Sequence, residues 1–184
     1  MERVYHSILS HLDFDGKGQI LDVGCGSGAL SIRAALVWPQ ARVLGIDAWP
    51  PAYNYSQRMC EKNAESEGVA VRCRFQRGDA NKLDFPDGRF DAVVSNYVYH
   101  NITGADRQAL LLETLRVLKK GGVFALNDEM KPRLYGDMEA FAQKLRDMGY
   151  EDVRLIDTAT EAFGSCRRAA MMMLGASRML VGRK

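Results

Sequence analysis

The chain has 184 residues, of which 47% are hydrophobic and 26% are charged, and its 25 basic and 23 acidic residues give a formal net charge of +2. This length and composition predict one ordinary globular domain, residues 1–184, with a substantial core. A net charge this small argues against a nucleic-acid-binding surface. The basic residues that gather near the C-terminus are expected to form a solvated face: Arg167, Arg168, Arg178, Arg183 and Lys184.

The cysteines and histidines show no pattern typical of disulfides or metal sites. No C-x-x-C pair occurs, and the three histidines have no metal-ligand spacing beside them. We therefore expect reduced thiols in a cytoplasmic protein, with neither a disulfide framework nor a metal site.

No signal peptide is visible, and the longest apolar stretch, residues 169–176, is far shorter than the roughly 20 residues that cross a bilayer. One interpretation of this stretch is a core-facing helix or the lead-in to a last strand. The other is an apolar wall that accepts a lipophilic substrate or meets a membrane surface.

The chain begins with a short amphipathic helix and a loop, within residues 1–18, because Val4, Ile8 and Leu12 share one helical face. Residues 19–23 then form a short apolar run rich in branched side chains, which predicts a buried strand. A glycine-rich turn, residues 24–28, follows this strand and precedes a helix that is expected to start at Ser27 as N-cap and to end near Trp38. Glycines allow the backbone to turn tightly and a ligand to come close, and the helix directs free N–H groups at the turn.

The glycine-rich turn predicts a nucleotide-type site, and its details discriminate among ligands. Gly24, Gly26 and Ala29 match the dinucleotide pattern G-x-G-x-x-G/A only loosely, because the third glycine falls at Gly28. Asp22 stands two positions before the first glycine, where a carboxylate is poorly placed beside a pyrophosphate. It is well placed to face a cationic ligand such as an ammonium or a sulfonium group.

Further strands are expected over residues 41–46, 70–76, 90–95, 123–126, 153–156 and 179–181. Helices are expected over residues 53–67, 105–119, 138–148 and 164–175, with Lys119–Gly122 closing the second of them. Such alternation predicts an α/β fold with helices on both faces of the sheet. The ligand of such a fold lies outside the carboxyl ends of the strands, where the strand order reverses.

Four polar residues lie at the carboxyl ends of the first four predicted strands, at that edge: Asp22, beside the glycines, Asp47, Asp79 and Asn96. Asp47 lies about twenty residues beyond the glycine-rich turn, where a carboxylate accepts hydrogen bonds from ribose hydroxyls in doubly wound domains. The alternative is that Asp47 only caps the next helix.

With these motifs in place, the chain resembles the class I S-adenosylmethionine-dependent methyltransferases, in the branch that acts on small or lipid-like acceptors. The resemblance is carried by ILDVGCGSG at 20–28, GID at 45–47, GDA at 78–80, LDFPDGRFDAVVS at 83–95 and LRVLKKGG at 115–122. It implies a Rossmann-like, seven-stranded mixed sheet whose last strand is antiparallel. It also implies S-adenosyl-L-methionine as cofactor and a small-molecule acceptor as partner.

The resemblance also implies a role for each matching position. The backbone of Gly24, Cys25 and Gly26 would contact the methionine part of the cofactor, and Asp22 would stand near its ammonium group. At the other strand ends, Asp47 would bind the ribose hydroxyls, Asp79 and Ala80 would bind at the adenine, and Asn96 would lie beside the methionine part. Ala48, next to Asp47, is also expected to bind the cofactor. Cys25 could instead be a nucleophile, although the loop favours a small residue whose backbone matters.

Residues 96–101 are the expected source of acceptor chemistry. Asn96-Tyr97-Val98-Tyr99 lacks the prolines of an N-P-P-Y signature, which argues against nucleic-acid or glutamine N-methylation. His100 is the candidate general base because it titrates near neutrality, with a structural histidine as the alternative. Tyr97 and Tyr99 are candidates to line the acceptor pocket, but one of them is expected in the core.

Asp128 and Glu129 follow the fifth predicted strand at the same edge, and they are either bases or caps of the following loop. Two other functions stay open at this stage. One is a regulatory module that binds S-adenosylmethionine without turnover. The other is an NAD-dependent oxidoreductase, which Asp22 and the glycine spacing disfavour.

Overall fold

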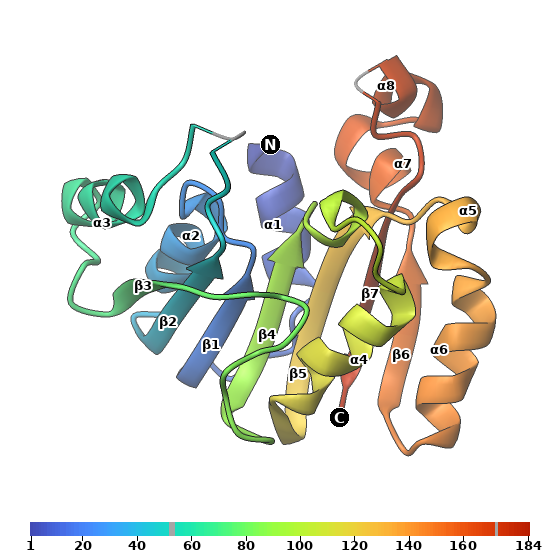
Figure 1. The fold of residues 1–184 in the computed structure, drawn as a ribbon, viewed down its shortest axis with the longest axis horizontal. Helices are drawn as coiled ribbons and strands as arrows, with labels where there is room; N and C mark the ends of the chain where they lie inside the picture. The colour runs from blue at the N-terminus through green and yellow to red at the C-terminus, as the bar shows by residue number, and fades with distance from the viewer. Residues whose placement is uncertain (52–53, 172) are drawn as a thin grey trace.

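The computed structural model describes residues 1–51, 54–171 and 173–184, and across them seven strands form one sheet in the order β3-β2-β1-β4-β5-β7-β6 (Figure 1). The first five strands run parallel, and β7 runs antiparallel to both β5 and β6. The predicted mixed seven-stranded sheet with an antiparallel last strand is therefore confirmed. The strands are β1 (Lys17–Val23), β2 (Gln40–Asp47), β3 (Cys73–Arg77), β4 (Phe90–Asn96), β5 (Leu118–Glu129), β6 (Glu151–Ile156) and β7 (Ser177–Arg183).

Helices cover both faces of this sheet, as predicted. Alternate residues along β1 point to opposite faces, so Ile20 packs in one buried cluster and Leu21 in the other. The first cluster takes side chains from α1, α2, α3 and α7, and the second from α4 and α6. The helices are α1 (Glu2–Ser10), α2 (Ala29–Val37), α3 (Gln57–Ser66), α4 (Arg107–Arg116), α5 (Pro132–Tyr135), α6 (Met138–Asp147), α7 (Thr158–Phe163) and α8 (Cys166–Met171), with a 3-10 turn η1 (Tyr99–Asn101).

The strand order reverses beside β1, which pairs with β2 on one side and β4 on the other. The loops that leave the carboxyl ends of β1 and β4 therefore diverge and open a crevice between them. The α1 N-terminus, the segment before α3, and α7 with α8 all lie at this carboxyl edge (Figure 1). No helix of the described ranges is long and apolar enough to cross a membrane.

The predicted helix end at residues 119–122 is wrong, because this segment is the irregular start of β5. The Val117 carbonyl already accepts a hydrogen bond from the N–H of Phe90 at 3.0 Å, which begins the pairing with β4. The pairing then jumps from Leu118 to Val123, and Lys119 in the bulge reaches the Asp91 carboxylate at 2.6 Å. Basic residues followed by glycines are typical of a helix end, but here the segment joins the sheet.

Two other helix boundaries differ from the prediction. Ser27 does not cap α2, because Gly28 occupies the N-cap position with a φ of 82°. The helix expected over 164–175 is α8, which ends at Met171, and α7 comes before it. Asp157 caps α7 through the N–H of Thr160, and Gly164 ends it with a φ of 79°.

Residues 52, 53 and 172 lie outside the described residues, so the expected starts and ends there are not assessed. Within the described part, α3 begins at Gln57 with Ser56 as its N-cap. The third strand begins at Cys73 rather than at residue 70.

Candidate active site

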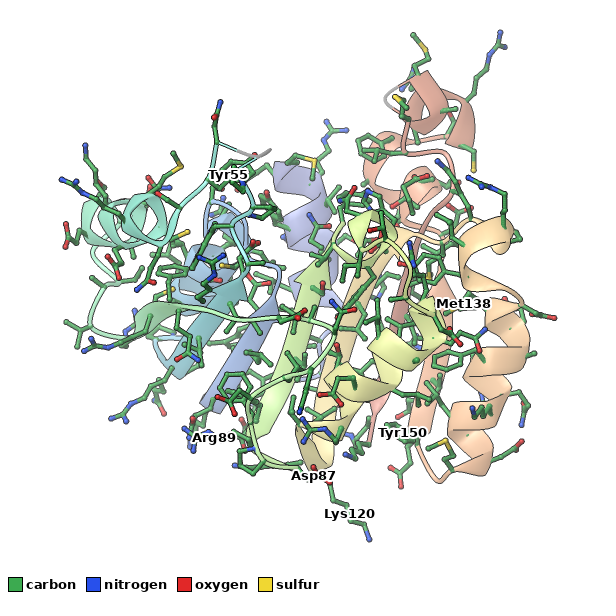
Figure 2. The ribbon with its side chains drawn as sticks, viewed as in Figure 1. Tyr55, Asp87, Arg89, Lys120, Met138 and Tyr150 are labelled. Carbon is green, nitrogen blue, oxygen red and sulfur yellow. The ribbon has the colours of Figure 1, made fainter. Side chains whose placement is uncertain are left out.

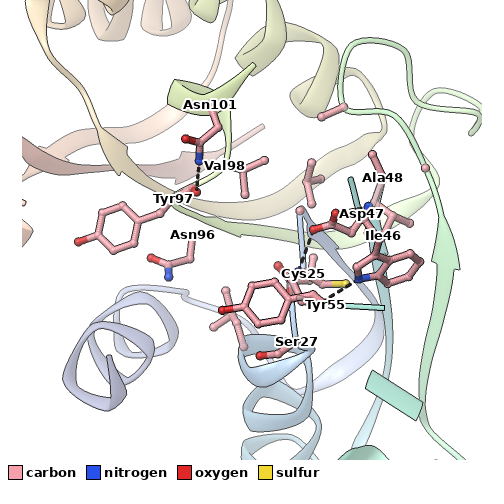
Figure 3. Close-up of a pocket in the computed structure, with 18 of the residues that line it drawn as sticks. Cys25, Ser27, Ile46, Asp47, Ala48, Tyr55, Asn96, Tyr97, Val98 and Asn101 are labelled. Atoms are coloured by element: carbon pink, nitrogen blue, oxygen red, sulfur yellow. Dashed lines mark hydrogen bonds between the residues drawn. The ribbon is translucent and has the colours of Figure 1, made fainter. Parts of the chain in front are cut away.

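A cavity of about 440 Å³ opens at the carboxyl edge between the loops that follow β1, β2, β3 and β4 (Figure 3). The predicted cofactor residues all line it, and so does Tyr97. His100 is not among the described residues that line the cavity. The predicted residues at the wall are Asp22, Gly24, Cys25, Gly26, Asp47, Ala48, Asp79, Ala80, Asn96 and Tyr97.

The glycine-rich turn is held against the end of β2 by backbone hydrogen bonds. The N–H groups of Gly24 and Cys25 both donate to the Ile46 carbonyl, at 2.8 and 2.9 Å. Gly24 has a φ of 72°, and a Cβ built on it would lie 2.2 Å from Cγ2 of Val98 in the loop after β4. The two sides of the crevice therefore touch at Gly24, where there is no room for a side chain.

We expect Gly24→Ala to lower the free energy of unfolding by about 2–3 kcal/mol, because it adds both a strained left-handed φ and the collision with Val98. Gly68→Ala is the matched control, since Gly68 has a φ of 70° and nothing within 4 Å of the added Cβ. Urea unfolding of both variants measures the difference. If both variants lost the same free energy of unfolding, the close approach of Val98 to Gly24 would not contribute to the cost.

Asp47 lines the cavity, and its carboxylate connects the glycine-rich turn to the segment after β2. Its Oδ2 accepts the N–H of Gly26 at 2.9 Å and its Oδ1 accepts the N–H of Trp49 at 2.7 Å. A carboxylate has about four acceptor sites, so each oxygen can still accept a hydroxyl from a ligand. Figure 3 shows Asp47 beside Ala48 and Ile46 at the cavity wall.

Trp49 supports the same turn, and the sequence analysis did not identify it. Its indole Nε1 donates to the Gly26 carbonyl at 2.8 Å, and the Cys60 thiol donates to that carbonyl at 3.1 Å. Trp49 has a φ of 41°, a conformation that non-glycine residues adopt uncommonly. The Trp-Pro-Pro sequence indicated only a chain break, so no sequence signal pointed to this contact. Met1, Tyr5 and Tyr55 also line the cavity without having been predicted.

Asp22 is 1% exposed, and its Oδ2 accepts a hydrogen bond from Ser31 Oγ at 2.6 Å. Burial raises the pKa of Asp22 to about 7, with a further upward contribution from the Asp47 charge, while the Ser31 hydrogen bond opposes the rise. A buried carboxylate of this kind favours a cationic group beside it, because a positive charge stabilises its ionised form.

The raised pKa of Asp22 predicts a pH-dependent stability. The folded state holds the proton more tightly than the unfolded state, so this stabilisation is complete below about pH 4 and is lost as the pH rises to about 7. Urea unfolding should show the wild type losing up to about 4 kcal/mol relative to Asp22→Asn across that range. If the free energy of unfolding of the two proteins changed with pH in the same way, the raised pKa of Asp22 would be contradicted.

The loop after β3 brings an exposed carboxylate to an apolar part of the cavity. Asp79 Oδ1 accepts the backbone N–H and the side-chain Nδ2 of Asn81, at 2.8 and 2.7 Å. Ile46, Ala80 and Ile102 line the cavity with it. Apolar walls with one hydrogen-bond acceptor suit a flat heterocycle that carries an amino group.

Tyr97 belongs to the cavity wall, and its hydroxyl is bonded away from the glycine-rich turn. The hydroxyl lies 2.7 Å from Ser177 Oγ, and burial raises the pKa of Tyr97. Figure 3 shows the Tyr97 ring directed away from Asp47 and Ala48. Asn96 also lines the cavity, and its Oδ1 accepts a hydrogen bond from Asn127 Nδ2 at 2.8 Å.

Asp128, at the end of β5, holds the loop after β4 through hydrogen bonds to its backbone. This fully buried carboxylate accepts the backbone N–H groups of Val98, Tyr99 and His100, at 3.1, 2.7 and 3.3 Å. The same carboxylate contacts Nδ1 of the His100 ring. Asp128 therefore anchors the preceding loop rather than capping the following one. Tyr99 is the tyrosine that belongs to the core, with its hydroxyl 2.9 Å from Thr114 Oγ1.

A family model and curated relatives both match this chain, and both are methyltransferases. Residues 20–122, more than half of the chain, match a family model described as a methyltransferase domain. A fatty-acid O-methyltransferase from Mycolicibacterium smegmatis is 34% identical over 131 residues, which cover 71% of this chain. The chain spans 43% of the length of that relative, so it corresponds to less than half of it.

Solved structures support the same fold. A geranyl diphosphate methyltransferase in complex with GPP and sinefungin superposes with a TM-score of 0.76 at 13% identity, over 99% of this chain and 78% of that one. The cyclase SpnF superposes with a TM-score of 0.74 at 21% identity, over 100% of this chain and 81% of that one. At these identities the likeness concerns the fold alone.

Proposed function

Because the chain belongs to the methyltransferase domain family of class I, S-adenosylmethionine-dependent enzymes, we propose that it transfers a methyl group from S-adenosylmethionine to a small-molecule or lipid-like acceptor. We propose further that residues 1–184 form one methyltransferase domain. The observation that carries the proposal is the cavity at the strand ends, where a buried Asp22, a Gly24 with no room for a side chain and Asp47 converge.

The residues of this cavity fit the cofactor part by part. The buried Asp22 would face the cationic end, and the backbone of Gly24, Cys25 and Gly26 would lie along the methionine part with Asn96 opposite. The remaining acceptor capacity of Asp47 suits two ribose hydroxyls, with Ala48 beside them. Asp79 and Ala80 would bind at the adenine, in the apolar part of the cavity.

The cofactor, when bound, supplies an activated methyl group, so the chain's own residues need only bind, orient and exclude water. An acceptor atom must lie in line with the methyl group at roughly 3 Å. Tyr97 and Val98 would form one wall of the acceptor side, and Tyr5 of α1 with Met1, the N-cap of α1, would form another. These side chains give the acceptor side an apolar character, which supports a lipid-like acceptor.

His100 remains our candidate base for acceptors that must lose a proton. Its Nδ1 contacts the Asp128 carboxylate, which favours the tautomer with the proton on Nδ1 and leaves Nε2 to accept one. An acceptor that reached His100 would have to extend beyond the lining residue Asn101. Tyr97, whose hydroxyl is already bonded to Ser177, is better suited to shaping the pocket than to proton transfer.

The test is a calorimetric titration with S-adenosylmethionine and S-adenosylhomocysteine, with NAD as the control. We expect micromolar binding of the two sulfur ligands and none of NAD. Transfer of labelled methyl to a long-chain fatty acid or a prenyl diphosphate would then demonstrate the activity. Binding of NAD alone, or of no ligand, would overturn the cofactor assignment, and binding without transfer to any acceptor would favour the regulatory module.

The four cysteines are free, with Cys25, Cys60 and Cys73 buried and Cys166 exposed. Free thiols support a cytoplasmic location for the proposed enzyme, because disulfides persist mainly in oxidising compartments.

A further inference from the structure

The tip formed by α8 and the turn after it exposes large apolar side chains at the carboxyl edge. Met171 is 85% exposed and Met173 is 79% exposed. Met1 and Tyr55, which line the cavity, are also exposed, at 55% and 47%. Figure 2 shows Tyr55 at this edge, whereas Asp87, Arg89 and Lys120 lie at the opposite edge. Single exposed apolar residues are common, but several at one edge indicate a binding surface.

The charged side chains of this tip are all basic. From Ala162 to Met179 the sequence has three basic residues, Arg167, Arg168 and Arg178, and no acidic one. Arg167 and Arg168 on α8 are exposed, and within the described part of the chain neither forms an ion pair. Arg178 lies 3.9 Å from Asp157, which neutralises it in part. Exposed apolar side chains can enter a bilayer interface, and unpaired arginines beside them can pair with anionic headgroups.

The tip is joined to the mouth of the cavity through α7 and α1. Glu161 of α7 accepts a hydrogen bond from Ser7 Oγ at 2.8 Å and pairs with His11 Nε2 at 3.0 Å. Ser7 and His11 belong to α1 and its C-cap, and Met1 and Tyr5 at the other end of α1 line the cavity. The exposed tip and the cavity mouth are thus parts of one connected edge, which Figure 1 shows above the strand ends.

We propose that this edge docks on an anionic phospholipid bilayer, with Met171 and Met173 entering the interface and Arg167 and Arg168 facing the headgroups. Positive charge complements the anionic headgroups, and the exposed methionines beside it can enter the apolar layer below them, which favours a lipid surface. A lipid-like acceptor would then reach the cavity directly from the bilayer. This last step rests on the proposed methyl transfer, whereas the docking is measurable without it.

The experiment is co-sedimentation of the full chain with vesicles of phosphatidylcholine alone and of phosphatidylcholine mixed with phosphatidylglycerol. We expect binding to the anionic vesicles that weakens as the salt concentration rises, and weak binding to the neutral ones. Arg167→Ala with Arg168→Ala should weaken binding about 25-fold, at about fivefold for each arginine. Met171→Ser with Met173→Ser should weaken it about tenfold or more.

Met148→Ser and Val71→Ser are the matched controls, because Met148 is 54% and Val71 is 87% exposed away from the tip. Both should bind vesicles as the wild type does, and a loss as large as that of the tip variants would overturn the proposal. Absence of wild-type binding to anionic vesicles would overturn it too.

Titration with S-adenosylhomocysteine separates the two proposals, since tip variants should keep wild-type affinity for it. Vesicle binding by a chain that binds no S-adenosylhomocysteine would sink the methyltransferase proposal and leave the docking in place.

Discussion

Asp47→Ala is expected to weaken S-adenosylhomocysteine binding by at least about 100-fold. The carboxylate accepts the N–H groups of Gly26 and Trp49, so its removal releases the glycine-rich turn on one side and the segment before α3 on the other. In our proposal it also accepts two ribose hydroxyls. A hydrogen bond to a charged group contributes about 1.5–3 kcal/mol, so two such bonds account for a loss of this size. Calorimetric titration measures it.

Asp147→Ala is the control for this variant, since Asp147 is an exposed aspartate of α6 whose carboxylate accepts Gln143 Nε2 at 2.9 Å. It should bind the ligand as the wild type does. Thermal unfolding without ligand shows whether Asp47→Ala remains folded at the titration temperature. A folded Asp47→Ala protein with wild-type affinity would remove Asp47 from the cofactor site.

The placement of the strand-end residues could be predicted because sheet topology alone determines it. Asp22, Asp47 and Asn96 each lie at or near the end of an apolar run, and parallel strands bring their carboxyl ends to one edge. No detail of side-chain packing is needed for that prediction. The antiparallel direction of β7 was implied only by the family resemblance, because the hydrophobic pattern of a strand does not show in which direction it runs.

Features that depend on contacts between distant segments were not predictable from the sequence. The Lys119–Gly122 segment has the composition of a helix end, and only its pairing with β4 turns it into strand. Trp49 reaches Gly26 through a backbone conformation that no local pattern specifies. The His100 ring turns toward Asp128, 28 residues later in the chain, and the sequence placed the loop correctly without fixing that direction.

Asp128 and Gly24 together explain why the crevice has a defined width. Asp128 holds the loop after β4 through its backbone N–H groups, and Val98 of that loop packs where Gly24 lacks a side chain. The cavity that we propose for the cofactor lies between these two sides. Asp128 is not among the described residues that line the cavity, but it can influence ligand affinity because it fixes the position of Val98, which does line it.

Asp128→Ala should lower the free energy of unfolding by about 4 kcal/mol. It would leave the N–H groups of Val98, Tyr99 and His100 without their acceptor in a buried site, at about 1–3 kcal/mol for each unsatisfied group before relaxation. Asp106→Ala is the matched control, because Asp106 also accepts two backbone N–H groups, those of Gln108 and Ala109, but at an exposed helix start. Such a cap contributes about 1 kcal/mol. Urea unfolding compares the two variants.

The two aspartates differ in burial and in the number of groups they hold, since Asp128 is fully buried and also contacts the His100 ring, whereas Asp106 is exposed and accepts only two backbone N–H groups. Asp128→Ala should also weaken S-adenosylhomocysteine binding, because a loosened loop no longer holds Val98 against Gly24. Asp106→Ala should leave that affinity unchanged. If Asp128→Ala cost no more stability than Asp106→Ala, water would be replacing the carboxylate, and the loop after β4 would owe its position to packing around Tyr99 instead.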